Sequence, residues 1–378
     1  MHRIALKTLL HHRAKVFAAL AGVAFATALM VIQIGLYDGL RARASILVDR
    51  VGGDLWIMAA GTSMVDDSEL LASGIDLRAS AHPCVESVRP AIVAWLPYRT
   101  PAGARHTLQL VGTDADTSRG APLVPWSMAE GLPGDLRGPG RVAIDEGDLR
   151  QLGLRPPLMG HRLEIAETEV RVAAVTTGIR NVSLIPIVFA DIVTARELAH
   201  ASPTGATYWV LDLAHPSCGP SIAAEIEREH PDLLVLTGEQ LAARTQHHVV
   251  TESGAGVALA FVALLGLIVG VVIVGQTLFS LVREHHKELG MLRAVGATRG
   301  ELAAFVGWMA TFVAVVGGGI GLGLAFAVDS GLGGRSIGIV YGPEAVLGGL
   351  AAVFVMCGIA GAISLASVLR LDVVKVLQ

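Results

Sequence analysis

The sequence predicts a membrane protein with four transmembrane α-helices and a large α+β extracytoplasmic domain inserted between helices 1 and 2. Of its 378 residues, 52% are hydrophobic and 16% are charged, and the charged share is well below that of soluble domains. Four apolar runs reach the length of about 20 residues that a helix needs to cross the hydrocarbon core. A long polar stretch, residues 38–250, separates the first run from the second.

The predicted segments begin with an amphipathic helix lying in the cytoplasmic interface. In chain order they are 1–15 (this helix), 16–37 (first span), 38–250 (inserted domain), 251–282 (second span with a stalk), 283–300 (cytoplasmic segment), 301–328 (third span), 329–343 (outer loop), 344–369 (fourth span) and 370–378 (cytoplasmic tail). Ala24-Phe25-Ala26 is similar to a signal-peptide cleavage site. The apolar run continues about ten residues beyond it, which favours a retained anchor.

The lysines predict the orientation of these spans. Lys7, Lys15, Lys287 and Lys375 all fall in segments on one side, and residues 38–250 contain no lysine. Since Lys and Arg concentrate in cytoplasmic loops, both termini are predicted to be cytoplasmic and the inserted domain periplasmic. The net charge of −4 gives no indication of nucleic-acid binding.

Short alternating or apolar runs in the insert predict strands, and helical patterns lie between them. The predicted strands are 54–58, 87–96, 107–111, 141–144, 162–165, 169–175, 186–190 and 207–213, and the predicted helices are 146–152, 191–198 and 221–229. Strands mixed with a few helices are typical of an α+β domain. The sequence shows no H-E-x-x-H signature, Ser-His-Asp order or zinc-ligand spacing, so we expect no catalytic, cofactor-binding or metal site in this chain.

The sequence contains three cysteines, of which Cys84 and Cys218 lie in the insert and Cys357 in the fourth span. If the insert faces an oxidising periplasm, Cys84 and Cys218 can form a disulfide. Two unpaired thiols that lie far apart in the fold are the alternative, and on sequence alone we favour it.

The second apolar run, residues 251–282, is longer than a membrane span requires. If it is wholly helical it extends about 48 Å, against a hydrocarbon core of about 30 Å. The excess predicts a stalk that joins the inserted domain to the cytoplasmic segment as one rigid lever.

Glycines predict close packing between the membrane helices. Gly266 and Gly270 form a small-xxx-small step, and Gly317 and Gly321 lie in a glycine-rich run of the third span. A phosphate-binding loop is the rival interpretation of such a run. That loop requires a Lys followed by Ser or Thr after a strand, and this run has neither, so we expect helix packing.

The charged segment between the second and third spans has the pattern of a short amphipathic helix. Read as a helix from Glu284, it places Leu289, Leu292 and Val295 on one face. A Thr-x-x-Glu capping box at 298–301 then predicts the start of the next helix. Such a helix at the cytoplasmic ends of two spans can bind a cytoplasmic partner. An ordinary amphipathic loop resting on the lipid surface is the alternative.

The stretch KELGMLRAVGATRGEL closely resembles the cytoplasmic segment of the FtsX-like permeases of ABC transporters, a group that includes the MacB, LolC/LolE and DevC types. In that family Glu-Leu-Gly, Leu-Arg-Ala and Gly-Ala-Thr follow one another after the second membrane helix. In this sequence they are Glu288–Gly290, Leu292–Ala294 and Gly296–Thr298. The resemblance is good over the spans and weak over the insert, whose layout is nearest the compact DevC type.

The resemblance implies a type VII ABC transporter permease, with a MacB-like periplasmic core domain in 38–250 and an FtsX-like permease domain in about 251–378. It also implies that 283–300 is a coupling helix that docks on a separate ATPase subunit. The residues expected at this contact are Arg283, Glu284, Glu288, Leu289, Met291, Leu292, Arg293 and Gly296. The sequence has no nucleotide-binding motif, so ATP and Mg²⁺ are expected on the partner ATPase.

The same resemblance implies a homodimer in the bacterial inner membrane that carries two ABC ATPase subunits and works by mechanotransmission. The expected process is efflux of a lipophilic substrate, with a periplasmic membrane-fusion (HlyD-like) adaptor and an outer-membrane TolC-like channel. Contact with membrane lipid is expected, and no nucleic acid. The alternative is an FtsX-like signalling subunit that regulates a periplasmic cell-wall hydrolase. A membrane-anchored enzyme would need a nucleophile and base that the sequence does not reveal.

The first testable prediction concerns Leu292→Asp. We expect this substitution to abolish stimulation of the partner ATPase without unfolding the spans, because a carboxylate cannot occupy the apolar groove that Leu292 is expected to fill. ATP turnover and recovery of the complex from membranes would be measured side by side for the variant and the natural sequence. Natural turnover together with natural complex recovery in the variant would refute the assignment.

Overall fold

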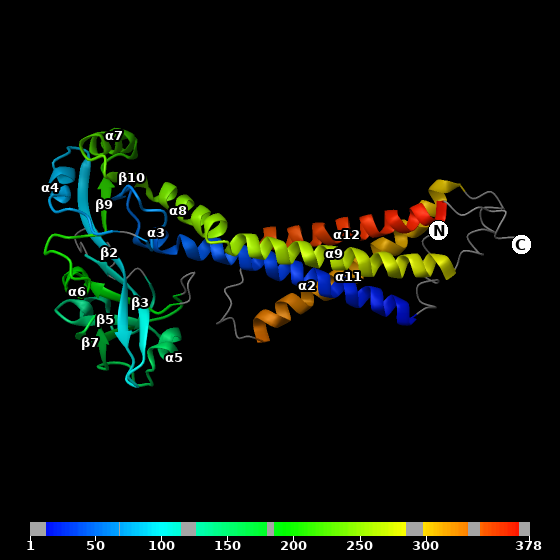
Figure 1. Cartoon of the computed structure of the whole chain (residues 1–378), viewed down its shortest axis with the longest axis horizontal. Coiled ribbons are helices and arrows are strands. Elements are labelled where there is room, and N and C mark those ends of the chain that lie inside the picture. Colours follow the sequence, from blue (N-terminus) through cyan, green and yellow to red (C-terminus); the bar gives the residue numbers. More distant parts are fainter. Residues whose placement is uncertain are drawn as a thin grey trace, which may run out of the picture. The chain divides into compact units, whose positions relative to one another are not determined.

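The computed structural model of the chain describes residues 13–67, 69–114, 126–179, 185–284, 298–331 and 341–369. The chain divides into two compact units (Figure 1). The first, called the membrane unit below, comprises Met1–Gly39 and Gly254–Gln378, and the second, called the insert unit, comprises Leu40–Ser253. The insert unit therefore packs as a separate body, although its sequence lies between the two parts of the membrane unit.

The insert unit is built on one mixed sheet of ten described strands. They are β1 (Leu55–Ala59), β2 (Val85–Arg99), β3 (Arg105–Thr113), β4 (Met128–Glu130), β5 (Arg141–Asp145), β6 (Arg162–Ile165), β7 (Thr168–Thr176), β8 (Ile187–Asp191), β9 (Tyr208–Leu213) and β10 (Leu233–Thr237). Their order is β10-β1-β9-β2-β3-β8-β5-β7-β4, and β6 pairs with β2 and β7 off this path.

The long strand β2 connects the two halves of this sheet. It is 15 residues long, pairs with β9 over its first half, and pairs with β3 and β6 over its second. Figure 1 shows it running from the end of the unit that carries α4 and α7 to the end that carries β5 and β7. Of the described strand pairs, β3–β8 and β5–β7 are parallel and the others are antiparallel.

Short helices cover the faces of the sheet. They are α3 (Ile46–Val51), α4 (Ile75–Ser80), α5 (Leu149–Leu152), α6 (Ile192–Leu198), α7 (Gly219–Glu229) and α8 (Gly238–His247). The start of α6 is capped by Asp191, whose Oδ1 accepts the backbone N–H of Ile192 at 2.9 Å. A capping box starts α8: Thr237 Oγ1 accepts from the backbone of Gln240, and Gln240 Oε1 accepts from the backbone of Thr237.

Successive residues of β1 point to opposite faces of the sheet, and both faces are buried. Trp56 and Met58 pack against α3 and α8 on one face. Leu55 and Ile57 pack against α4 and α7 on the other. A third apolar cluster fills the half of the sheet around β3, β5, β7 and β8, where α5 and α6 cover it.

The predicted α+β class is confirmed by these elements. All eight predicted strands and all three predicted helices are present, with ends that differ by a few residues. The sequence does not predict β4, β10, α3, α4 or α8. The apolar run LLVLT of β10, for example, has no periodicity that separates a strand from a helical segment.

Cys84 and Cys218 are joined by a disulfide, with their Cα atoms 6.5 Å apart. The favoured expectation of two distant thiols is therefore not what the structure shows. The cysteines are 134 residues apart in sequence, but the antiparallel pairing of β2 with β9 brings their segments together. The backbone N–H of Ala214 donates to the carbonyl oxygen of Cys84 at 2.9 Å, and Cys218 follows in the turn before α7.

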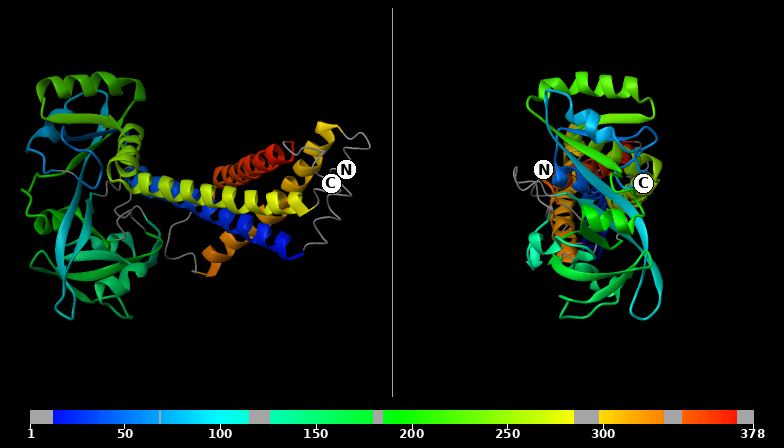
Figure 2. Two further views of the ribbon diagram at one scale, coloured as in Figure 1. Left: turned by 45° about the vertical axis from the view of Figure 1, so that its right-hand side comes forward. Right: turned by 90° about the vertical axis from the view of Figure 1, so that its left-hand side faces the viewer.

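Four described helices are long and apolar enough to cross a membrane. They are α2 (Arg13–Ala44), α9 (Ala255–Glu284), α11 (Arg299–Gly331) and α12 (Pro343–Leu369), and Figure 2 shows them in two further views. Pro343 occupies the first position of α12, one residue before the predicted start of the fourth span, and its missing N–H costs no helical hydrogen bond there. Residues 1–12 of the predicted N-terminal helix (1–15), residues 332–340 of the predicted outer loop (329–343) and the whole predicted tail (370–378) lie outside the described residues.

The helix of the first span is longer than predicted. The apolar run ends near residue 37, but α2 continues to Ala44. Its last residues, LRARA, consist of Leu, Arg and Ala, which are among the strongest helix formers, so the helix outlasts the hydrophobic run.

The predicted uninterrupted lever over 251–282 is wrong at its beginning. A short π-helix, His248–Glu252, precedes Ser253 and Gly254, and α9 starts only at Ala255. The φ of Gly254 is +75°, a backbone conformation that ends a right-handed helix. The hydrophobicity of the run gives no sign of this break, because Gly254 and Gly256 are indistinguishable in composition from the packing glycines that follow.

Glycines of α9 lie against α2 within the membrane unit. A Cβ added to Gly266 would lie 2.7 Å from Leu29 Cδ2, and one added to Gly270 would lie 3.0 Å from Ala26 Cβ and also meet Met356 Sδ. A side chain at Gly270 would crowd Ala26, and one at Gly266 would force the end of the Leu29 side chain aside, so both glycines favour the close approach of α2 and α9.

Glycines of α11 lie against the opposite side of α2. A Cβ on Gly317 would lie 2.8 Å from Val23 Cβ, and one on Gly321 would lie 2.6 Å from Thr27 Cβ and would also meet the carbonyl oxygen of Ala24. The four glycines that the sequence singles out therefore all lie at contacts with α2.

We predict that replacing Cys84 and Cys218 by serine lowers the free energy of unfolding of the insert unit by about 2–4 kcal/mol, because the unfolded chain gains the freedom of a long loop. Denaturant unfolding of the full chain in lipid nanodiscs would measure this, with Cys357→Ser as the control. Equal labelling of Cys84 by a maleimide with and without reductant would contradict the pairing.

A second prediction concerns the contact between α11 and α2. Gly321→Ala should destabilise the membrane unit by about 1–3 kcal/mol, because the new methyl group meets backbone atoms of α2 that cannot move aside. Gly323→Ala is the matched control, since nothing lies within 4 Å of a Cβ at that position. Unfolding in mixed detergent micelles would compare the two variants, and equal stability losses would argue against a packing role for Gly321.

Candidate functional site

The residues predicted to contact an ATPase fall at or beyond the end of α9. Arg283 and Glu284 are the last two residues of this helix. The other six, Glu288, Leu289, Met291, Leu292, Arg293 and Gly296, lie outside the described residues. The structure therefore gives the two ends of this segment, and the contact itself remains a prediction.

The predicted capping box, Thr298 with Glu301, is present where the chain enters α11 after the ATPase-contact segment. Thr298 Oγ1 lies 3.3 Å from the backbone nitrogen of Glu301, which donates to it. Glu301 Oε2 in turn accepts from the backbone N–H of Thr298 at 2.8 Å and from its hydroxyl group at 3.1 Å. These reciprocal bonds satisfy backbone donors at the start of α11, so the segment has a defined exit into the third span.

The helix that enters the segment is held by its neighbours. Besides the glycine contacts with α2, α9 packs along α12, where Ser364 Oγ lies 3.4 Å from the carbonyl oxygen of Gly275. Gly22 of α2 completes the α2–α9 contact, since a Cβ there would meet the side chain of Ile273. The helix that leads into the segment is therefore in contact with both α2 and α12 within the membrane unit.

The end of α2 within the insert unit carries a hydrogen-bond cluster that we call the Ser45 cluster, made of Arg41, Ser45, Asp49 and Gln246. Ser45 lies between α2 and α3, is 2% exposed, and keeps a helical backbone with φ −97° and ψ −4°. Its hydroxyl group donates to Asp49 Oδ2 at 2.9 Å and accepts from Gln246 Nε2 at 2.9 Å. Arg41 Nη2 donates to Gln246 Oε1 at 3.3 Å. Gln246 of α8 is thus bonded to Arg41 in the last turn of α2 and to Ser45 at the α2–α3 junction.

Apolar contacts and one buried hydrogen bond reinforce the Ser45 cluster. Leu47 and Val48 of α3 and Leu241 of α8 belong to the same buried cluster. Next to Gln246, the fully buried Thr245 accepts the backbone N–H of Val65 at 3.1 Å. Helices α3 and α8, which lie near the two ends of the insert unit's sequence, are therefore fixed to one another.

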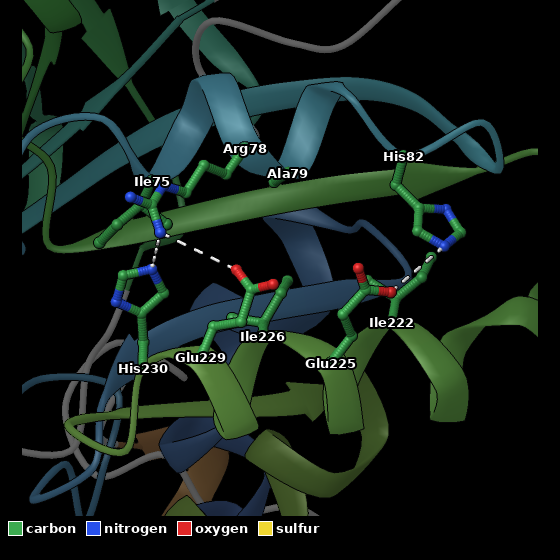
Figure 3. A pocket seen from close by; sticks show the side chains of 9 residues that line it. All are labelled: Ile75, Arg78, Ala79, His82, Ile222, Glu225, Ile226, Glu229 and His230. Atoms are coloured by element: carbon green, nitrogen blue, oxygen red, sulfur yellow. Dashed lines mark hydrogen bonds and ion pairs between the residues drawn. The ribbon is translucent and has the colours of Figure 1, made fainter.

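A pocket lies between α4 and α7 of the insert unit, and Figure 3 shows it from close by. It is lined by Ile75, Arg78, Ala79, His82, Ile222, Glu225, Ile226, Glu229 and His230. Arg78 Nη1 donates to His230 Nε2 at 2.8 Å and lies 3.8 Å from Glu229 Oε2. His82 Nε2 lies 3.9 Å from Glu225 Oε2. These polar groups bond across the rim, so they serve as contacts between the two helices, and the sequence singles out none of these residues.

A smaller pocket lies where α3 meets the sheet. It is lined by Arg43, Ala44, Ile46, Leu47, Asp66, Gln109, Val111, Trp126 and Ile187. Burial raises the pKa of Asp66, and the hydrogen bond from Gln109 Nε2, 2.6 Å long, lowers it in part. Asp66 is consequently protonated more readily than a surface aspartate.

Sequence reasoning misses the Ser45 cluster because its bonds join residues that are far apart in the chain. Ser45 and Gln246 are 201 residues apart, and neither belongs to a recognisable motif. The one local signal is that Ser45 interrupts a run of helix formers. Within the described ranges, no group of three His, Cys, Asp or Glu side chains could hold a metal ion.

Two family models match this chain, and together they cover both units. Residues 16–229 match the MacB-like periplasmic core domain, and residues 260–373 match the FtsX-like permease C-terminal domain. A similar protein is the macrolide export ATP-binding/permease protein MacB 1/2 of Paracoccus denitrificans, with 26% identity. The alignment includes all of this chain and 58% of that protein, so the chain spans less than two thirds of this relative.

Two solved structures resemble part of the chain at 12% sequence identity each. The periplasmic region of MacB from Actinobacillus actinomycetemcomitans aligns over 52% of this chain and 94% of its own, with a TM-score of 0.37. The extracellular domain of the noncanonic ABC-type transporter YknZ from Gram-positive bacteria aligns over 49% of this chain and 98% of its own, with a TM-score of 0.36.

The core-domain match extends over more than half of the chain, and the permease match follows it in the order that the four-helix topology requires. This chain belongs to the MacB/FtsX-like family of ABC transporter permeases.

Proposed function

We propose that this chain is the permease subunit that transmits ATP-driven motion from a separate ATPase to its periplasmic domain. One observation carries the proposal. The segment with the ATPase-contact motif lies between the end of α9 at Glu284 and the capped start of α11 at Thr298, and both helices pack through glycines on α2. Displacement of the segment would therefore move α2, which continues as a helix into the insert unit.

The composition of the spans supports mechanical transmission over movement of a substrate through the bilayer. Residues 255–277 and 303–328 contain no Asp, Glu, Lys or Arg. Ionisable residues within spans usually mark an ion path or a proton relay, so these two spans have no such path of their own. In this proposal ATP and Mg²⁺ bind to the partner ATPase, and the permease supplies the moving parts.

We propose efflux as the process, since the Paracoccus denitrificans relative is a macrolide export protein. The substrate would be lipophilic, and the assembly would be tripartite, with a membrane-fusion adaptor in the periplasm and a channel in the outer membrane. The permease would act as a homodimer with two ATPase subunits, in contact with membrane lipid. Both termini would lie in the cytoplasm, consistent with the position of the lysines.

An affinity pull-down of the tagged full chain from detergent-solubilised native membranes tests this proposal. We expect mass spectrometry to identify an ABC ATPase together with an adaptor protein. The Leu292→Asp chain, purified in parallel, should lose the ATPase and keep the adaptor, because the two partners bind on opposite sides of the membrane.

Two outcomes would count against the proposal. Recovery of an ATPase together with an activator of a cell-wall hydrolase, and without an adaptor, would replace efflux by signalling. Resistance of Cys84 and Cys218 to alkylation shows that the insert unit is folded in the preparation. If such a preparation contains no ATPase, the coupling role is refuted.

A further inference from the structure

Three arginines form one row across neighbouring strands of the insert unit. Arg171 of β7 lies opposite Arg141 of β5 and opposite Arg162 of β6. Residues that lie opposite each other on paired strands point to the same face of a sheet. All three arginines are exposed, and the residue that follows each of them is buried in one apolar cluster: Val142, Leu163 and Val172. The arginine row therefore lies on the face turned away from that cluster.

The packing of the sheet does not account for the arginine row. Like charges directly opposite each other on neighbouring strands destabilise a sheet, and this row makes two such contacts. Strands lie about 4.8 Å apart, so the three positions fall within a width of about 10 Å. Natural proteins tolerate such local costs chiefly where a function requires them. A concentration of positive charge on this scale indicates a site for an anion.

The carboxylates of this face are already bound to other arginines of the face. Glu169 Oε1 accepts from Arg162 Nη1 at 2.7 Å. Glu164 Oε1 lies 3.4 Å from Arg99 Nη1. Arg171, by contrast, forms neither an ion pair nor a side-chain hydrogen bond with any residue in the described ranges. The central guanidinium of the row therefore keeps its full positive charge.

The charge of Arg141 is not neutralised either. Its Nη1 donates to the backbone carbonyl oxygen of Asp135 at 3.2 Å, and among the described residues it has no carboxylate partner. The carboxylate of Asp135 instead accepts the backbone N–H of Leu132 at 2.8 Å. Two uncompensated guanidinium groups, those of Arg141 and Arg171, thus belong to directly opposite positions of β5 and β7.

Both of these guanidinium groups lie against glycines of neighbouring loops. A Cβ added to Gly160 would lie 3.3 Å from Arg171 Nη2, and one added to Gly138 would lie 3.6 Å from Arg141 Nε. The backbone N–H of Arg171 also donates to the carbonyl oxygen of Gly140 at 2.7 Å, which joins the loop before β5 to β7. A side chain at Gly160 would crowd the Arg171 guanidinium, so the glycine allows the loop to support it from one side.

We propose that Arg141 and Arg171 form the centre of a binding site for a phosphate group, with Arg162 at its flank. A guanidinium presents a planar fork of N–H donors that matches the oxygens of a phosphate group. A phosphate monoester with two negative charges would balance the two uncompensated guanidinium groups. The ligand is a free phosphate or a phosphorylated lipid headgroup, which present the same chemistry. This site goes beyond the coupling role proposed above and does not rest on it.

Titration calorimetry on the full chain in phosphatidylcholine nanodiscs tests the site at low ionic strength, because salt screens exposed charges. The probes are inorganic phosphate and a short-chain phosphatidic acid, and empty nanodiscs give the heat of partitioning. We expect saturable binding to one site per chain. Equal affinities for the two probes would identify free phosphate as a sufficient ligand. Tighter binding of the phosphatidic acid would identify a lipid headgroup.

Arg171→Gln should weaken binding by about tenfold or more, because it removes a charge-assisted hydrogen-bond donor. It should leave the melting temperature of the insert unit unchanged or higher, since it removes two contacts between like charges. Arg228→Gln is the matched control, because Arg228 is an exposed arginine of α7 outside the arginine row, and it should bind like the natural sequence. Glu169→Gln should tighten binding by about threefold, since it releases Arg162 from a surface ion pair.

Two results would overturn the proposal directly: equal affinities for Arg171→Gln and Arg228→Gln, or no saturable binding of either probe. If Arg171→Gln lowers the melting temperature, its loss of binding can come from misfolding, and Glu169→Gln then decides. Unchanged or weaker binding in Glu169→Gln would overturn the site in that case. These measurements need no ATPase, so a failure of the pull-down would not affect them, and they can fail while the coupling role stands.

Discussion

Close contact between helices in a bilayer depends on small residues, because burying one apolar side chain against another gains little where lipid is the alternative. In this protein α2 satisfies that constraint on several sides: glycines of α9 and α11 meet it, and Gly349 of α12 lies against Val31. The result is visible in burial, since half of the most apolar window of α2 is buried, compared with 17% for α9. The first span is therefore the element around which the other three are arranged.

This arrangement gives the central helix two roles that are usually separate. Within the membrane unit α2 is the packing core, and within the insert unit its end is the base on which α3 and α8 are fixed through the Ser45 cluster. A helix that contacts every other span and also continues into the soluble domain can collect displacements from several sources. Coupling over long distances requires such rigid elements to have two discrete arrangements.

Much of this architecture is predictable from local sequence. Composition and run length identify the four spans, and alternation of apolar and polar residues identifies the strands of the two sheet halves. Two local features mislead: the polarity at Asp38 suggests an early end for a helix that reaches Ala44, and the apolar run at 251–282 hides the break at Gly254.

The remaining errors have a different origin, since they concern contacts between residues far apart in the chain. The pairing of β2 with β9 brings Cys84 to Cys218, and the packing of α3 on α8 brings Ser45 to Gln246. No periodicity encodes either contact. Such pairs follow from the topology of the sheet, which a single sequence determines only through the sum of many weak preferences.

The strand order has a consequence for how the protein is made. Strand β1 lies between β9 and β10, so the first strand of the insert pairs with the last two that the chain provides. If the insert crosses the membrane in N-to-C order, both edges of β1 remain without their native partners until residues 208–237 have also crossed. Open strand edges are templates for aggregation, and long-range pairing is slow to form. Folding of the insert is thus the stage at which the edges of β1 are open to mispairing.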